Sequence, residues 1–340
     1  MIALEALSAL PVDEFTAALG AIFEHSPWVP QRAAAARPFN SRLDLLDAMR
    51  AVVHAAPAEE QLSLIRAHPQ LGARGRRRAQ LTEASSREQR RAGLDACTDE
   101  EFDELLRLNT AYVHKFSFPF ILAVRGHDPG SILASMGSRL NNDSELERHT
   151  ALTQIGLIGG YRLADVIASP AGAEIKGMSD RLATAAVDAG PAASLLREWM
   201  LAANLDLHTG PDGALAGIQQ HDPNATYLLT GVYADPTTST LRRDGSLGSL
   251  LGIAVAQQIR QNALAPRFNL CVLATSGTAD SDPLAPLRSA GLNPRFEVYV
   301  RDRTTAATAH HPDEPPDQRT LERAAQTLEN FLIQPPQIQE

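Results

Sequence analysis

A histidine in the first half of the chain has the residue type and position that suit proton transfer. His68 directly precedes Pro69, and a helix normally ends at or before the residue that precedes a proline. His68 is therefore predicted at a helix end, facing the loop that follows. An imidazole that titrates near neutrality is a candidate general acid or base at such a place. A lone histidine is more often structural, so this position alone does not decide its role.

Ser85 and Glu88 form the pattern Ser-x-x-Glu, and Gln89 adds a side-chain amide directly after it. The spacing matches a helix capping box, in which the two side chains satisfy free backbone amides of the first turn. The same geometry leaves N–H groups at a helix start that bind anions or carbonyl groups. Both interpretations stay open from the residues alone.

Arg162 falls on the apolar face of a predicted helix. Ile155, Ile158 and Val166 share this face at spacings of three or four residues. An unpaired buried charge is very costly, so this arginine needs an acidic partner. The partner is either a structural carboxylate or the carboxylate of a substrate, which the guanidinium fork binds through two parallel hydrogen bonds.

The stretch KFSFPFILAVRG, residues 115–126, lies between these groups in the chain. Pro119 has no N–H and interrupts a helix, which frees backbone groups nearby. The apolar residues after it suit a pocket wall whose amides contact a ligand, and they suit a buried core equally well.

Residues 1–168 are predicted to be almost entirely helical, without a convincing strand. Apolar residues recur at helical spacing in several segments, namely 11–25 (with Phe15, Leu19, Ile22 and Phe23), 41–56, 58–67, 99–116 (with Phe102, Leu105, Leu106, Asn109, Tyr112 and Phe116) and 144–168. These helices are the elements that must position His68, Glu88 and Arg162.

The pattern changes after about residue 170. Small and polar residues at 170–190 predict a linker. Short β-rich runs then alternate with helical runs, the former at 226–234, 267–276 and 295–302 and the latter at 246–261 and 320–334. Such alternation predicts an α/β layer with a largely parallel sheet. The expected architecture is thus a two-domain chain, with an all-α domain at 1–169, a linker at 170–190 and an α/β domain at 191–340.

Composition and charge argue against several classes of protein. The net charge of −9 over 340 residues argues against general nucleic-acid binding, and four arginines at 74–78 form either a solvated turn or a local attraction for an anionic substrate. No apolar run reaches the roughly 20 residues that span a bilayer. Cys97 and Cys271 fit no metal spacing and suggest reduced thiols. The N-terminus has no basic region typical of a secretory signal, so we expect a cytoplasmic protein that binds neither membrane nor nucleic acid.

A series of motifs in the first half resembles one enzyme family. EHSPWVPQRAAAARPF, HPQLG, SSREQRRAGL, LNTAYVHKFSFPFILAVRG, RLNN and ALTQIGLIGGYRL occur in this order. Together they resemble the OHCU decarboxylases of urate breakdown over about residues 2–168, with Ser117 where the family often has glycine. The resemblance implies a compact all-helical fold, a homodimer and no metal or organic cofactor. It implies decarboxylation of 2-oxo-4-hydroxy-4-carboxy-5-ureidoimidazoline (OHCU) to (S)-allantoin and carbon dioxide.

The resemblance also implies a role for individual residues. The catalytic histidine of the His-Pro motif falls on His68, and the glutamate of the Ser-x-x-Glu-Gln motif falls on Glu88, which could fix the tautomer of the histidine. The implied substrate contacts are Pro69, Ser85, Ser86, Arg87, Gln89, Phe120, Ile121, Leu122, Ala123, Val124 and Arg162. The chemistry agrees, because the electron pair left by carbon dioxide can be delocalised into the C=N system of the substrate ring, without a pyridoxal or thiamine group.

The second half resembles the zinc-dependent amidohydrolases related to allantoate amidohydrolase, but without its full ligand set. Tyr233 stands where that family has a metal-binding histidine, and Gly277 and Thr278 stand near the expected paired glutamates. Asp235, Asp244 and His310 remain, while His311 suits a polar loop. Because a hydrolytic zinc site needs several ligands and an activated water, we expect a trimmed, non-catalytic relative. The alternatives are a bifunctional enzyme that hydrolyses allantoate or a related ureido compound, and a binding or assembly module.

Overall fold

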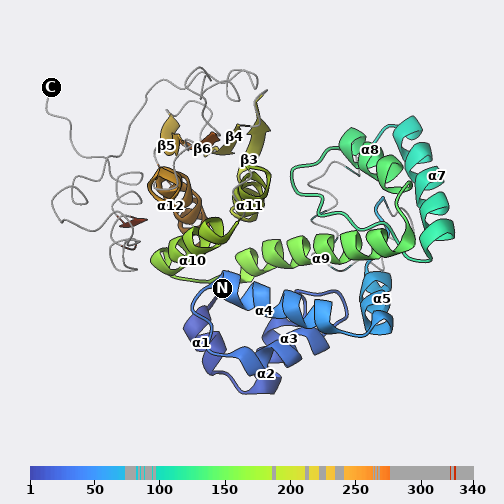
Figure 1. Cartoon of the computed structure of the whole chain (residues 1–340), viewed down its shortest axis with the longest axis horizontal. Helices are drawn as coiled ribbons and strands as arrows, with labels where there is room; N and C mark the ends of the chain where they lie inside the picture. Colours follow the sequence, from blue (N-terminus) through green and yellow to red (C-terminus); the bar gives the residue numbers. More distant parts are fainter. Residues whose placement is uncertain are drawn as a thin grey trace, which may run out of the picture. The chain divides into compact units, whose positions relative to one another are not determined.

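The computed structural model describes residues 1–72, 82, 85, 88, 94, 97–185, 189–210, 214–221, 227–233, 241–262, 264, 266, 269–275, 322, 325 and 326. The chain divides into two compact units. We call residues 2–39 and 44–166 the helical unit, and residues 1, 40–43 and 167–340 the sheet unit. Figure 1 shows the elements of both.

The helical unit is built from helices of one to six turns. In chain order they are α1 (Leu4–Ala9), α2 (Val12–Leu19), α3 (Trp28–Ala33), the 3-10 helix η1 (Ala34–Ala36), α4 (Arg42–Ala55), α5 (Ala58–Ala67), α7 (Asp99–Phe116), α8 (Pro129–Arg139) and α9 (Ser144–Val166). The predicted helical character is confirmed for these segments. Strand within the described part of 1–168 is confined to two-residue pieces, β1 (Ile2–Ala3) and β2 (Ile167–Ala168).

Several predicted boundaries agree with the structure, and others differ. α5 ends at Ala67, and His68 follows it in an extended conformation with ψ of 138°, as expected of a residue before proline. α2 is shorter than predicted because it ends at Leu19. On α7 and α9, Leu106 and Val166 were placed on the buried faces but are 45% and 38% exposed.

α7 supports the loop that follows His68. The Asn109 side chain donates to the Leu71 carbonyl at 3.2 Å, which gives this buried polar residue a partner. Gly72 has φ of +72°, and a Cβ there would lie 2.2 Å from the Leu105 side chain. Only glycine combines this backbone conformation with so close an approach, so the HPQLG motif is fitted to the surface of α7.

Ser117, the position where the motif departs from the resembled family, ends α7 in the left-handed region with φ of 61°. A residue with a Cβ is strained there, whereas glycine is not. The departure is thus tolerated at a helix C-cap, and the turn still directs the chain into Phe118, Pro119 and the buried segment beyond.

The sheet unit contains a mixed sheet, not the largely parallel one that was predicted. Its elements are α10 (Ala171–Thr184), α11 (Ala189–Ala202), β3 (Asp206–Thr209), β4 (Leu215–Gln219), β5 (Tyr227–Tyr233), α12 (Leu241–Gln261) and β6 (Asn269–Thr275), with strand order β3-β4-β6-β5. β5 and β6 are parallel, as expected for two strands joined by a helix, and β3–β4 and β4–β6 are antiparallel. The β3–β4 hairpin was not predicted as strand.

The prediction of a linker at 170–190 is wrong for residues 171–184, which form α10. Ala171, Ile175 and Met178 lie on one face of this helix and are buried in the core of the sheet unit. The Glu174 side chain is also buried and accepts from the Arg42 amide at 2.8 Å. The segment was predicted as a linker because it is rich in small residues. Its apolar positions nevertheless recur at spacings of four and three, as in an amphipathic helix.

The predicted strand at 295–302 lies outside the described residues. Of the predicted helix at 320–334, the structure describes Glu322, Ala325 and Gln326, which are helical. None of the helices in the described part of the chain combines the length and the apolar character needed to cross a membrane.

Candidate active site

A pocket in the helical unit is lined by most of the residues that the sequence predicted to be catalytic or substrate-binding. It encloses about 350 Å³ of empty space, part of which is open to solvent. Its lining residues are His68, Pro69, Leu71, Ser85, Glu88, Phe120, Ile121, Leu122, Val124, Ile158 and Arg162. Parts of the chain that are far apart in sequence therefore meet here: the end of α5, Ser85 and Glu88, the stretch after Pro119, and α9.

The His68 ring is held in one orientation by the last turn of its own helix. Its Nδ1 lies 2.9 Å from the Leu64 carbonyl oxygen. Because a carbonyl only accepts hydrogen bonds, Nδ1 must carry the proton, and Nε2 of the neutral ring then has a free lone pair. Nε2 is buried and has no hydrogen-bond partner among the residues that the structure describes. The tautomer is thus fixed by Leu64, and not by Glu88 as the sequence suggested.

His68 does not titrate near neutrality, contrary to the prediction. Burial lowers the pKa of His68 to about 4, although the hydrogen bond to Leu64 and the negative charge of Glu24 act in the opposite direction. His68 is 6% exposed. At neutral pH His68 is therefore an uncharged imidazole, which suits a general base in the unliganded protein.

In the unliganded protein, the partners of Arg162 are carboxylates of the chain itself. Of the two predicted partners, a structural or a substrate carboxylate, the structural one is therefore present. Its Nε and Nη2 atoms each lie 3.0 Å from the Glu88 carboxylate, a bidentate pair. Its Nη1 atom lies 2.9 Å from Glu24. Nη2 also donates to Ser85 at 3.2 Å, and Nη1 to the Ala21 carbonyl at 3.3 Å. A substrate carboxylate could occupy the fork only by displacing Glu88.

Ser85 and Glu88 do not form the capping box that their spacing suggested. The Ser85 amide donates to the Thr82 hydroxyl at 3.3 Å, so Thr82 makes the contact typical of an N-cap residue. This leaves the Ser85 and Glu88 side chains available to Arg162. Both Ser85 and Glu88 line the pocket.

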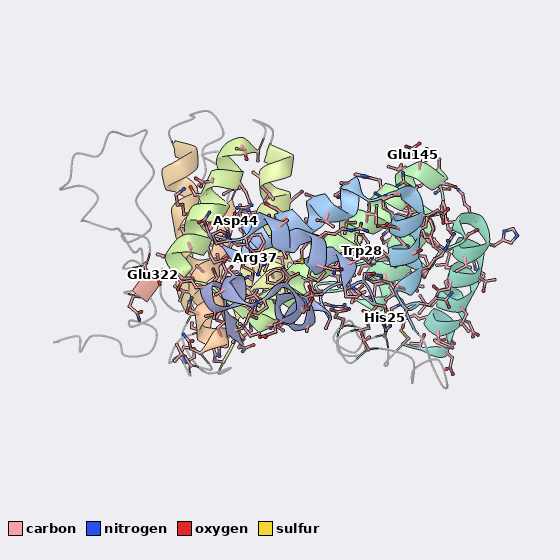
Figure 2. All side chains as sticks on the ribbon, turned by 90° about the horizontal axis from the view of Figure 1, so that it is seen from below. His25, Trp28, Arg37, Asp44, Glu145 and Glu322 are labelled. Carbon is pink, nitrogen blue, oxygen red and sulfur yellow. The ribbon has the colours of Figure 1, made fainter. Side chains whose placement is uncertain are left out.

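Glu24 is a member of the site that the sequence did not predict. Its side chain is 2% exposed, and it pairs with Arg162 and accepts from Ser85 at 3.4 Å. Burial raises the pKa of Glu24, but the charge of Arg162 and hydrogen bonds from Thr82 and Arg162 outweigh this effect and hold the pKa below its ordinary value. The available signal was an acidic residue directly after the apolar Ile22 and Phe23. His25 and Trp28, which follow in the chain, are labelled in Figure 2.

A glycine on α9 allows Glu24 to reach the site. A Cβ on Gly159 would lie 3.2 Å from the Phe23 ring and 3.6 Å from the Ile22 side chain. Both contacts are close enough that the segment at 22–24 packs directly against the α9 backbone. Gly159 precedes Arg162 by one helical turn, so this packing brings the Glu24 carboxylate to the guanidinium.

The segment at 120–124, which follows Pro119 and forms one wall of the pocket, contains backbone amides without a partner among the described residues. Residues 118–124 are buried and lie outside any helix or strand. The Ala123 amide donates to the Gln154 side chain at 2.9 Å. The amides of Phe120, Leu122 and Val124 have no hydrogen-bond partner in the described part of the chain. Because buried amides are almost always paired, these groups are suited to a ligand in the pocket.

Some predicted residues are not part of the described pocket. Ser86, Arg87 and Gln89 lie outside the described residues. Ala123 does not line the pocket, since its amide is committed to Gln154.

In the second half, Asp235, Gly277, Thr278, His310 and His311 also lie outside the described residues. Tyr233 ends β5, and Asp244 lies in α12.

Comparison with known proteins places this site in a family. The family model described as OHCU decarboxylase matches residues 8–164. A 2-oxo-4-hydroxy-4-carboxy-5-ureidoimidazoline decarboxylase of Haloferax volcanii is 40% identical over 166 residues, which are 49% of this chain and 96% of that protein. The uric acid degradation bifunctional protein PucL of Bacillus subtilis is 40% identical over 176 residues, or 52% of this chain and 35% of PucL.

Among solved structures, an (S)-allantoin synthase aligns with a TM-score of 0.41 and 29% identity over 50% of this chain and 55% of that chain. The sequence relatives carry the assignment, because the Haloferax protein aligns over nearly its whole length. The aligned first half also contains every residue that lines the pocket. The chain therefore belongs to the OHCU decarboxylase family of carboxy-lyases.

Proposed function

We propose that the helical unit decarboxylates OHCU to (S)-allantoin, with His68 as the acid–base group. The observation that carries this assignment of the residue is the free Nε2 lone pair on a buried, neutral and oriented imidazole that lines the pocket. A base in such a position accepts a proton from a bound substrate without first losing one to water.

The proposed reaction relays one proton through His68 and takes up one more from solvent. The bond to the carboxylate breaks, its electron pair passes through the conjugated C=N system onto the ring nitrogen, and carbon dioxide leaves. His68 Nε2 takes the proton of the adjacent hydroxyl, which becomes the carbonyl of the product. The resulting imidazolium returns this proton to the neighbouring ring carbon, and the ring nitrogen takes a proton from solvent. Delivery from one side of the pocket gives a single enantiomer.

We propose that two kinds of group bind the substrate. Backbone amides donate to its oxygens, and an acidic side chain accepts from its N–H groups. The unpaired amides of Phe120, Leu122 and Val124 suit the carboxylate and carbonyl oxygens of the substrate. Glu88, oriented by Arg162, suits the N–H groups of the ureido arm. We propose that Arg162 acts on substrate binding through Glu88, which it holds in place, and that Pro69 and the residues at 85–89 complete the site.

The proposed function is tested by adding freshly made OHCU to the full chain and following the optical activity of the allantoin formed. We expect rapid production of the (S) enantiomer, above the rate without protein. Product formed at the protein-free rate, or as a racemate, would contradict the proposal.

The low pKa of His68 predicts an unusual pH profile. Since the neutral form is the base, kcat/KM should be flat from about pH 8 to 5 and fall as the pH approaches about 4. A histidine with the ordinary pKa of 6.5 would produce the fall near that pH. An acid limb at pH 6–7 would contradict this prediction.

The lowered pKa of His68 also makes the stability of the folded chain fall as the pH is lowered. The pKa is lower in the folded than in the unfolded state, so the unfolded chain binds more protons between the two values. Stability is therefore fully present above about pH 6.5 and is lost progressively as the pH falls toward 4. Unfolding measured across this range should show a smaller acid loss for His68→Asn than for the unchanged chain.

For the second half we propose a non-catalytic relative of the zinc amidohydrolases, and for the whole chain a homodimer. The support comes from Tyr233, Gly277 and Thr278, which replace three expected metal-binding groups. Loss of one histidine and two glutamates leaves too few metal-binding groups for a two-metal centre. A bifunctional enzyme remains the alternative.

We expect elemental analysis of the purified chain to find no stoichiometric zinc or manganese, and decarboxylation to survive dialysis against a chelator. Retained metal together with allantoate hydrolysis that depends on Asp244 and His310 would favour the bifunctional alternative. Decarboxylation that the chelator abolishes and metal restores would overturn the metal-independent mechanism of the helical unit.

A further inference from the structure

The RLNN motif at 139–142 has no role in the proposed chemistry, yet it lies next to the pocket wall. Arg139 is the last residue of α8, and its side chain is 12% exposed. Its Nη1 donates to the Ile121 carbonyl at 2.8 Å, and its guanidinium carbon lies 4.5 Å from the centre of the Phe120 ring. Both Phe120 and Ile121 line the pocket.

Arg139 is itself fixed by a fully buried carboxylate. Its Nε lies 3.0 Å and its Nη2 lies 2.5 Å from Glu147 Oε1. Asn142 donates to Glu147 Oε2 at 2.7 Å, and the Tyr112 hydroxyl donates to Oε1. Glu147 is 0% exposed. The first and last residues of the motif therefore converge on one acceptor, which holds the guanidinium in a single orientation.

A second anchor acts two residues further along the wall, where Gln154 of α9 accepts from the Ala123 amide. The anchored groups belong to residues 121 and 123, and the unpaired amides belong to 120, 122 and 124. Anchoring the Ile121 carbonyl and the Ala123 amide thus leaves the amides of 120, 122 and 124 available to a ligand.

We propose that Arg139 and Gln154 are positioning residues for the decarboxylation, which set the wall at 120–124 without touching the substrate. This inference rests on the proposed function. Arg139 fixes the carbonyl of Ile121 and the ring of Phe120, while Gln154 fixes the amide of Ala123. A small displacement of reacting groups lowers rates steeply, so loosening either anchor reduces catalysis while His68 stays intact.

The first test uses Arg139→Lys. Lysine retains the charge beside Glu147, but its single ammonium group lacks the planar fork that bonds Glu147 and Ile121 together. We expect kcat/KM to fall by about 10-fold or more, with KM raised and kcat lowered. The acid limb of the pH profile should stay where it is in the unchanged chain.

Tyr112→Phe is the matched control in the same buried network, because it removes a hydrogen bond to Glu147 and leaves the Arg139 contacts in place. Its thermal midpoint should fall, while kcat and KM stay within about twofold of the unchanged chain, since the wall keeps its anchors. If Tyr112→Phe loses kcat/KM as Arg139→Lys does, the network supports folding only and the proposal is wrong.

Gln154 provides a second test at a partly exposed site, should Arg139→Lys not fold. Gln154→Ala removes the acceptor for the Ala123 amide and should lower kcat/KM by about fivefold or more. Gln154→Glu keeps an acceptor oxygen and should retain most of the kcat/KM of the unchanged chain. Equal kinetics for the two variants and the unchanged chain would overturn the proposal. Absence of turnover in the unchanged chain would instead contradict the proposed function.

Discussion

His68→Asn is expected to lower the rate of decarboxylation by about 10²–10⁴-fold, the usual contribution of general acid–base catalysis. The asparagine amide retains a donor for the Leu64 carbonyl, so the end of α5 should keep its geometry. It has no basic lone pair to replace Nε2. Single-turnover assays with freshly made substrate, combined with circular dichroism to establish folding, measure the effect.

His25→Asn is the matched control for this substitution. His25 is exposed, lies next to Glu24 in the chain, and has φ of 47°, a conformation that asparagine tolerates well. Its rate should stay within about twofold of the unchanged chain, since His25 does not line the pocket. Near-normal turnover by a folded His68→Asn variant would remove His68 from the mechanism.

Arg162→Met is expected to destabilise the chain by about 3–5 kcal/mol, the cost of removing one partner from a buried ion pair. Glu24 is 2% exposed at its side chain and would be left without its guanidinium. Glu88 is less affected because its side chain is 23% exposed. Urea unfolding followed by fluorescence gives the change in stability.

Adding Glu24→Gln to the Arg162→Met variant tests which of two effects lowers the stability. One is the unpaired charge of buried Glu24, and the other is the lost packing of the Arg162 side chain. The double variant should recover a large part of the lost stability, because a neutral amide costs less to bury than an unpaired carboxylate. No recovery would show that Glu24 is not the cause. Arg162→Lys retains the charge and should fold, but it cannot reproduce the bidentate contact with Glu88 and should weaken substrate handling.

Local sequence determined most of the helical unit. The proline after His68 set the end of α5, and apolar spacing gave the limits of α7 and the burial of Tyr112 and Phe116. The same kind of reasoning failed at 171–184, where small residues disguised the apolar face of α10. It also missed the β3–β4 hairpin, in which β4 pairs along its other edge with β6, a strand distant in the chain.

The ordered motifs determined the family and brought His68, Glu88 and Arg162 together as candidates. The sequence could state that a buried arginine needs a carboxylate, but it could not say which one, because Glu24 precedes Arg162 by 138 positions and Glu88 by 74. Only the tertiary structure decided that both carboxylates bind it.

The protonation state of His68 was likewise decided by packing. The residue type of His68 predicted a pKa near neutrality, while burial in the pocket lowers that pKa to about 4 and the Leu64 carbonyl selects the tautomer. Residue type and spacing are local properties of the chain. Desolvation and the choice of hydrogen-bond partner depend on every segment that closes around the group, so they arise only when the helices have packed.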